Sequence, residues 1–148
     1  MTDNLKAFLA MISHSEGTDR FGDQGGYNVL VGGGLFHDFS EHPHKVIDLG
    51  HGLKSSAAGR YQLLGRYWDV YKVQLHLPDF GPDSQDRVAI QQIKECKALG
   101  DIEAGNIESA IRKCCRIWAS LPGSGYGQRE NAMAPLVAYY QQQGGEVA

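Results

Sequence analysis

A glutamate at the end of the first helical pattern has the residue type and spacing to transfer a proton. Glu16 lies four residues after the last member of an apolar stripe and falls on the same helical face. Gly17 follows it, and glycine is the residue that most often ends a helix in a left-handed conformation. The four apolar residues of the stripe are Leu5, Phe8, Leu9 and Ile12. The sequence therefore predicts a carboxyl group on an apolar surface at a helix C-terminus.

Both features of this position raise the pKa of a carboxyl group. Burial disfavours the charged form, and the partial negative charge of a helix C-terminus does the same. Such a glutamate can hold a proton near neutral pH and act as a general acid, as cleavage of a glycosidic bond requires. The alternative is that Glu16 simply points into water, as most glutamates do.

A second carboxylate, which most glycosidases use, does not stand out. Five acidic residues follow Glu16 in the next part of the chain, and none has an apolar setting. Asp19 is close in sequence, but an aspartate there can equally accept hydrogen bonds from turn amides. The five are Asp19, Asp23, Asp38, Glu41 and Asp48.

Two polar and aromatic stretches are suited to holding a sugar chain. "AAGRYQLL" contains Tyr61 and Gln62, and "LPGSGYGQ" contains Tyr126 and Gln128. Aromatic faces and side-chain amides are typical of a carbohydrate groove. The alternative is a helix start with Tyr61 in the core and an ordinary turn.

Metal, cofactor and thiol chemistry are not indicated. His37, His42 and His44 have irregular loop spacing, short of a recognisable metal-ligand pattern, so we expect no metal site. "VGGGLF" lacks the lysine and hydroxyl residue of a phosphate-binding loop, and we expect no cofactor. Three cysteines, one of them unable to pair within the chain, are typical of a reducing compartment, and we expect all three to be reduced. They are Cys96, Cys114 and Cys115.

Length and composition favour one domain that spans residues 1–148. The formal charge of −3 argues against a nucleic-acid partner. No run of about 18 apolar residues occurs, so we expect no stable membrane insertion, and the first residues do not resemble a secretory signal. The 19 glycines exceed the roughly ten expected from average usage, and seven lie between Gly17 and Gly34. This enrichment predicts tight turns after the first helix.

Five helical patterns and a short β region make up the expected architecture. "YNVLVGGGLFHDF" predicts two short strands around a glycine turn, and "HKVIDL" predicts another. The fold class is therefore α+β, a helical body with a small glycine-rich β region, and we expect a cleft where the two meet. For the third helix Asp83 or Ser84 is the expected cap, and for the fourth Asn106. The helices are expected at residues 3–15, 58–75, 84–99, 107–120 and 131–143.

Five stretches in register resemble the bacteriophage lambda endolysin family over nearly the whole chain. They are "KAFLAMISHSEGTD", "YNVLVGGGLFHDFSEHPHK", "SSAAGRYQLL", "DFGPDSQDRVAIQQIKE" and "IWASLPGSGYGQ". The resemblance implies a lysozyme-like fold and a lytic transglycosylase. Members cleave the β-1,4 bond between N-acetylmuramic acid and N-acetylglucosamine in peptidoglycan and leave a 1,6-anhydromuramic end.

The resemblance also assigns residues and partners. It makes Glu16 of "SEGT" the catalytic acid, and it implies sugar contacts for Tyr61, Gln62, Tyr126 and Gln128. It further implies accumulation in the host cytoplasm and action on the wall after a holin has permeabilised the membrane. We expect a monomer, because the enzyme must diffuse through the wall. A hydrolase that uses Asp19 or Asp23 to position water is the alternative enzyme, and a glycan-binding module without activity is the alternative class.

Overall fold

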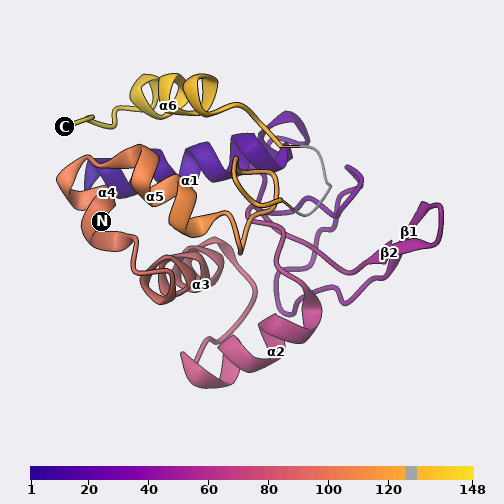
Figure 1. Ribbon diagram of the computed structural model, residues 1–148. Coiled ribbons are helices and arrows are strands. Elements are labelled where there is room, and N and C mark those ends of the chain that lie inside the picture. The colour runs from indigo at the N-terminus through magenta and orange to yellow at the C-terminus, as the bar shows by residue number, and fades with distance from the viewer. Residues whose placement is uncertain (126–129) are drawn as a thin grey trace. The chain divides into compact units, whose positions relative to one another are not determined.

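The computed structural model describes residues 1–125 and 130–148, in which six α-helices and one two-stranded sheet occur (Figure 1). The expected α+β class is thus confirmed. The chain divides into two compact units, the first made of residues 1–16 and 89–148 and the second of residues 17–88. A single domain over the whole chain stays a prediction.

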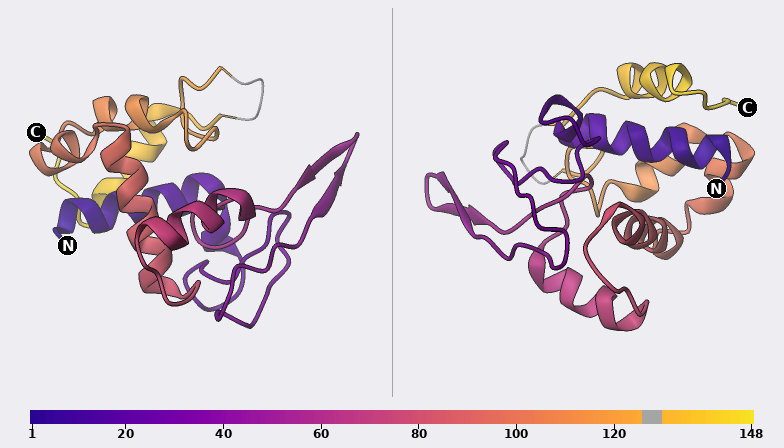
Figure 2. Two further views of the ribbon diagram at one scale, coloured as in Figure 1. Left: turned by 90° about the horizontal axis from the view of Figure 1, so that it is seen from below. Right: turned by 180° about the vertical axis from the view of Figure 1, so that it is seen from behind.

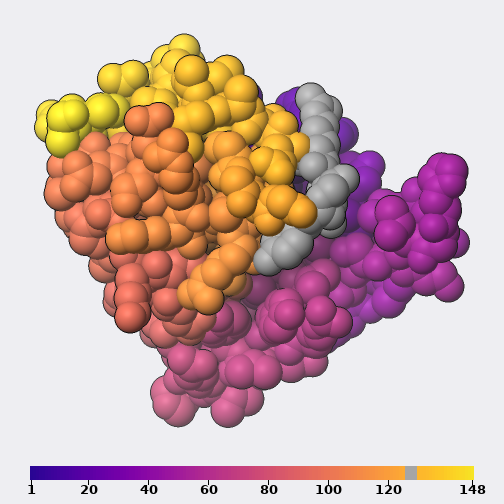
Figure 3. Space-filling model, viewed as in Figure 1, coloured from indigo at the N-terminus to yellow at the C-terminus, as the bar shows by residue number. Residues whose placement is uncertain are grey.

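The first unit is helical and is built from both ends of the chain. Helix α1 packs against α6 and α4, and α4 packs against α5 (Figures 1 and 2). On the face shown in Figure 3 the segments around α5 and α6 lie side by side. Helix α3 begins in the second unit and ends in the first. The bounds are α1 Asp3–Glu16, α3 Pro82–Glu95, α4 Leu99–Ala104, α5 Ile107–Cys114 and α6 Met133–Gln142.

The apolar stripe of α1 is buried as its spacing predicts, and the helix has a defined start and end. Thr2 caps the start, because its hydroxyl accepts a hydrogen bond from the backbone N–H of Leu5 at 3.2 Å. Gly17 ends it in a left-handed conformation with φ of +82°. The first unit's core joins the stripe to residues of the other helices. Its largest buried side chains include Phe8, Leu9, Met11, Ile12, Ile93, Ile102, Ile107, Ile111, Trp118 and Tyr140.

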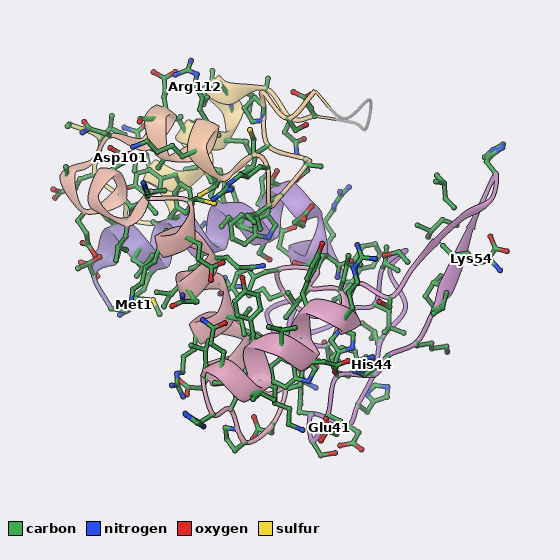
Figure 4. All side chains as sticks on the ribbon, turned by 60° about the horizontal axis from the view of Figure 1, so that its bottom comes forward. Met1, Glu41, His44, Lys54, Asp101 and Arg112 are labelled. Carbon is green, nitrogen blue, oxygen red and sulfur yellow. The ribbon has the colours of Figure 1, made fainter. Side chains whose placement is uncertain are left out.

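The second unit combines a hairpin, a short helix and glycine-rich turns. Strands β1 (Ile47–Gly50) and β2 (Leu53–Ser55) pair antiparallel, with Asp48 opposite Lys54. Lys54 is labelled on this hairpin in Figure 4. Helix α2 (Gly65–Gln74) buries Trp68 against Phe80. The other buried members of this core are Leu30, Phe36, Ala58, Leu63, Leu77 and Val88.

The second helix is shorter than predicted, because residues 58–64 form a turn. Gly59 has φ of +86°, and Ala58 and Leu63 pair across the turn through two backbone hydrogen bonds. The side chain of Gln85 binds the turn by accepting a hydrogen bond from the backbone N–H of Arg60 at 2.9 Å. Apolar periodicity alone could not reveal this, since it comes from a residue 25 positions away.

The later helices also depart from the prediction at their ends. The third ends at Glu95, and a separate helix, α4, was missed. Asp83 and Ser84 lie inside α3, and Asp79 organises its start by accepting hydrogen bonds from Gly81 N–H and the Ser84 hydroxyl. Asn106 lies at the predicted cap of α5, but its side chain makes no capping hydrogen bond.

Helix α5 ends at Cys114 rather than at Ser120, because the chain tightens into turns. In them the backbone N–H of Ile117 donates to Cys114 O at 3.0 Å, and that of Leu121 donates to Trp118 O at 3.0 Å. Trp118 and Leu121 are nevertheless buried as predicted. In α6, Pro135 occupies the first turn, where its missing N–H has no intrahelical acceptor to lose.

The β region is more irregular than predicted. Around the glycine turn only an isolated bridge joins Val29 and Leu35, so the two expected strands are wrong. The strand expected in "HKVIDL" is present as β1, and its partner β2 was missed. Within residues 1–125 and 130–148, no helix is long and apolar enough to cross a membrane.

Candidate active site

Glu16 is the last residue of α1 and is partly buried. Burial raises the pKa of its carboxyl group from 4.5 to about 7. The Ser120 hydroxyl donates a hydrogen bond to Glu16 Oε2 at 3.0 Å, which acts in the opposite direction and lowers the pKa. The expected elevated pKa is therefore confirmed, and its cause is desolvation.

Two further polar residues of the first unit surround this pair. Ser15 is 8% exposed, and its Oγ lies 2.8 Å from Ser120 Oγ. Asn131 Nδ2 donates to both the carbonyl oxygen and Oγ of Ser15, each at 3.0 Å. No local sequence pattern predicts these contacts, because Ser120 and Asn131 lie more than 100 residues from the end of α1.

The carboxylate of Glu130 binds the turn that follows Leu121. Glu130 accepts hydrogen bonds from the backbone N–H groups of Gly123 at 2.9 Å and Gly125 at 3.2 Å, and from the Ser124 hydroxyl at 3.3 Å. These bonds hold the pKa of Glu130 below its usual value. The predicted sugar contacts Tyr126 and Gln128 lie outside the described residues.

The other two predicted sugar contacts have structural partners in the second unit. Tyr61 is 5% exposed, and its hydroxyl donates to Asp86 Oδ1 at 2.6 Å. Gln62 has φ of +54°, and its Nε2 donates to the carbonyl oxygens of Val29 and Gly59. A sugar contact for either residue stays a prediction.

Arg60 joins Tyr61 to a second tyrosine. Its Nη1 donates to the hydroxyls of Tyr27 and Tyr61, each at 3.1 Å, and the guanidinium group lies over both rings. The Tyr27 hydroxyl in turn donates to Asp86 at 2.8 Å. Two opposite charges are thus linked through two phenols. Neither Arg60 nor Asp86 is among the site residues predicted from the sequence.

The five acidic residues considered as a second carboxylate are all exposed. Asp38 Oδ1 accepts a hydrogen bond from Ser40 N–H, and Asp48 Oδ1 accepts one from Gly50 N–H, as is typical of turns. Glu41, labelled in Figure 4, pairs with Lys72 Nζ at 2.7 Å. None of these three contacts indicates a catalytic carboxylate.

Known proteins with similar sequences identify the family of this chain. The profile of the endolysin family matches residues 6–147. The endolysin of Escherichia phage lambda is 54% identical over 150 residues, which cover 99% of this chain and 95% of the relative. That of Escherichia phage P2 is 49% identical over 155 residues, covering 96% and 93%.

The chain belongs to the endolysin family. The chain is therefore an enzyme that degrades the bacterial cell wall.

Solved endolysin structures show the expected lysozyme-like fold. Bacteriophage lambda lysozyme in complex with a chitohexasaccharide superposes with a TM-score of 0.98 at 52% identity, covering 100% of this chain and 98% of that one. A second structure of lysozyme from bacteriophage lambda gives 0.94 at 51% identity with the same coverage. The predicted family and fold are confirmed.

Two of the three histidines considered as metal ligands, His42 and His44, have other partners in this endolysin. His42 is buried, and its Nε2 lies 2.8 Å from Leu63 O. Exposed His44, labelled in Figure 4, lies 2.9 Å from Asp69 Oδ1. Of the residues the structure describes, no group of three or more His, Cys, Asp or Glu side chains could hold a metal ion.

Proposed function

We propose that this endolysin is a peptidoglycan lytic transglycosylase in which Glu16 serves first as the acid and then as the base. The pKa of about 7 carries the proposal. A carboxyl group with this pKa is populated in both protonation states near neutral pH, as a group that gives and then takes a proton requires.

The reaction cleaves one bond and forms another without consuming water. Glu16 protonates the glycosidic oxygen between N-acetylmuramic acid and N-acetylglucosamine, and the bond from that oxygen to the muramic C1 breaks. The 6-hydroxyl of the same muramic ring attacks C1, and the Glu16 carboxylate removes its proton. The products are a 1,6-anhydromuramic end and a new 4-hydroxyl, and Glu16 is protonated again.

An intramolecular nucleophile makes a second carboxylate unnecessary. The 6-hydroxyl is held next to C1 by its own ring, which gives it a high effective concentration. This agrees with the turn and ion-pair contacts of Asp38, Glu41 and Asp48. The glycan substrate itself is supported by the chitohexasaccharide in the lambda lysozyme complex.

Mass spectrometry of digested cell walls tests the reaction. The new muramic ends should be lighter by one water than reducing ends, whatever the time of digestion. Reducing ends would instead identify a hydrolase that uses Asp19 or Asp23 to position water. Glu16→Gln should remove both kinds of end, because the acid and base roles depend on the same carboxyl group.

Cellular location and partners belong to the same proposal. The location and the holin rest on the family resemblance, and the monomeric state rests on the need to diffuse through the wall. The enzyme accumulates in the host cytoplasm as a monomer and reaches the wall in the periplasm after a holin has permeabilised the inner membrane. Expression in a host without a holin tests this. Lysis should follow only when the membrane is permeabilised chemically, and spontaneous lysis would contradict it.

A further inference from the structure

We propose that Ser120 is a positioning residue for Glu16, and that Asn131, acting through Ser15, fixes the direction in which Ser120 donates its hydrogen. The inference rests on the proposed catalytic role of Glu16. It assigns a function to three polar side chains that the reaction itself does not use.

Asn131 sets the direction of donation in this chain of hydrogen bonds. Its side-chain nitrogen faces the carbonyl oxygen of Ser15 at 3.0 Å, and a carbonyl can only accept. The group facing it must therefore be the amide NH₂ and not the amide oxygen. The same nitrogen lies 3.0 Å from Ser15 Oγ, so it donates there as well.

The remaining hydrogens then align toward Glu16. Ser15 Oγ accepts from Asn131, and its own hydrogen is free to be donated to Ser120 Oγ at 2.8 Å. Ser120 in turn donates its hydrogen to Glu16 Oε2 at 3.0 Å. Each bond in such a chain polarises the next, and together they favour the ionised carboxyl group.

The chain of hydrogen bonds opposes the effect of burial on the pKa of Glu16. Burial raises the pKa of Glu16 and the Ser120 hydrogen bond lowers it. These two causes account for the shift in the described part of the protein, with no charged neighbour among them. A stronger or weaker hydrogen bond would move Glu16 away from the value at which both protonation states are populated near neutral pH.

A backbone hydrogen bond fixes the position of Asn131, the member of the hydrogen-bond chain farthest from Glu16. Asn131 N–H donates to Ser120 O at 2.8 Å, so both residues are fixed at the two ends of the 121–130 segment. Ser124 Oγ also donates to Ala119 O at 2.9 Å. The base of the segment that carries Tyr126 and Gln128 is therefore the same structure that orients the Glu16 carboxyl group.

Titration of Glu16 by NMR tests the inference without requiring catalysis. Protein labelled with ¹³C at glutamate side chains would be compared as wild type, Ser120→Ala, Ser120→Thr and Asn131→Leu. Ser120→Ala should raise the pKa of Glu16 by about one unit. Ser120→Thr keeps the hydroxyl and should restore it. Asn131→Leu has a similar size, cannot donate to Ser15 and adds no charge, so it should raise the pKa too.

Kinetics on purified peptidoglycan provide the second readout. Ser120→Ala should lower kcat about tenfold with little change in KM, and should move the alkaline limb of the rate profile upward with the pKa. Ser109→Ala is the matched control, because Ser109 donates a similar part-buried hydrogen bond to Asp101 at 3.2 Å elsewhere in the first unit. It should change neither readout.

The outcomes separate this inference from the proposed function. An unchanged Glu16 titration in folded Ser120→Ala, verified by circular dichroism, would overturn the positioning role. An active Glu16→Gln would instead refute the catalytic assignment, whatever the titration shows. A pKa shift in Ser120→Ala that Ser120→Thr reverses, with kcat following it, supports both.

Discussion

The hydroxyl of Tyr61 donates to Asp86 Oδ1 at 2.6 Å, and the same carboxylate oxygen accepts from Tyr27 at 2.8 Å. Arg60 donates to both phenol oxygens, so each hydroxyl accepts from a cation and donates to an anion. Burial raises the pKa of Tyr61 above its usual value. The ring that sequence analysis assigned to sugar binding is thus integrated into the second unit's interior.

Replacing the Tyr61 hydroxyl distinguishes these two roles. Tyr61→Phe keeps the ring but removes two hydrogen bonds to charged partners, and should destabilise the protein by about 1–3 kcal/mol. Urea unfolding measures the loss. Below the unfolding temperature kcat and KM should stay within about twofold of wild type. An unchanged stability with a large rise in KM would show instead that the hydroxyl contacts the glycan.

Glu16 should make the protein less stable as pH rises. Its folded pKa of about 7 exceeds the ordinary 4.5, so the folded state binds the proton more tightly. The resulting stability is fully present below pH 4.5 and is lost as pH rises through 7. The shift corresponds to about 3 kcal/mol. Glu16→Gln should match wild type at pH 4 and be more stable by about this amount at pH 8. If the difference in unfolding free energy between wild type and Glu16→Gln were the same at pH 4 and pH 8, the burial of this carboxyl group would be contradicted.

Activity should fall along the same titration. A general acid works only when protonated, so kcat/KM on peptidoglycan should decrease tenfold per pH unit well above the pKa of Glu16. Turbidity of permeabilised cells between pH 5 and 9 measures this. A rate that rises steadily through this range would mean that Glu16 acts only as a base.

Replacing the glycine in the turn before α2 should destabilise the protein. Gly59 has φ of +86°, and a Cβ atom there would meet the Gln85 amide oxygen and lie 3.1 Å from the Phe80 ring. Gly59→Ala should cost about 2–4 kcal/mol, since strain and a close contact add. Gly52→Ala is the control, with φ of +75° but nothing within 4 Å of its Cβ. It should cost only the strain, about 1 kcal/mol. Equal losses would show that the contact with Gln85 is unimportant.

The three reduced cysteines should react at different rates. Cys96 and Cys114 are buried, and burial raises the pKa of the Cys114 thiol. Cys115 is partly exposed. A thiol reagent should modify Cys115 at least about tenfold faster than the others in the native protein, and all three after denaturation. Mass spectrometry after partial labelling identifies the residue. Rapid labelling of Cys114 would contradict the helix packing.

The parts of the fold that sequence predicted are those with a local cause. The α1 stripe, its end at Gly17 and the inward residues Ile111 and Trp118 follow from spacing within a few residues. Residues 58–64 form a turn and not the predicted helix, because a hydrogen bond to Gln85, 25 residues further along the sequence, stabilises the turn. Periodicity describes a segment and carries no information about its partners.

The site divides along the same line. The raised pKa of Glu16 could be predicted because an apolar helical face implies desolvation. Ser120 and Asn131 could not, since a hydrogen bond across more than 100 residues leaves no pattern. The polar and aromatic residue types of "AAGRYQLL" and the family resemblance both indicate Tyr61 and Gln62 as sugar contacts, but only the structure shows that their polar atoms bind protein groups.

The first unit draws its residues from both ends of the chain, which has a consequence during synthesis. Glu16 leaves the ribosome more than 100 residues before Ser120 and Asn131. A nascent chain or a C-terminally shortened one contains the acidic group without the neighbours that bury and orient it. The proton donor is thus assembled only after residue 131 has been made, and a chain that stops before it carries Glu16 without its hydrogen-bonding partners.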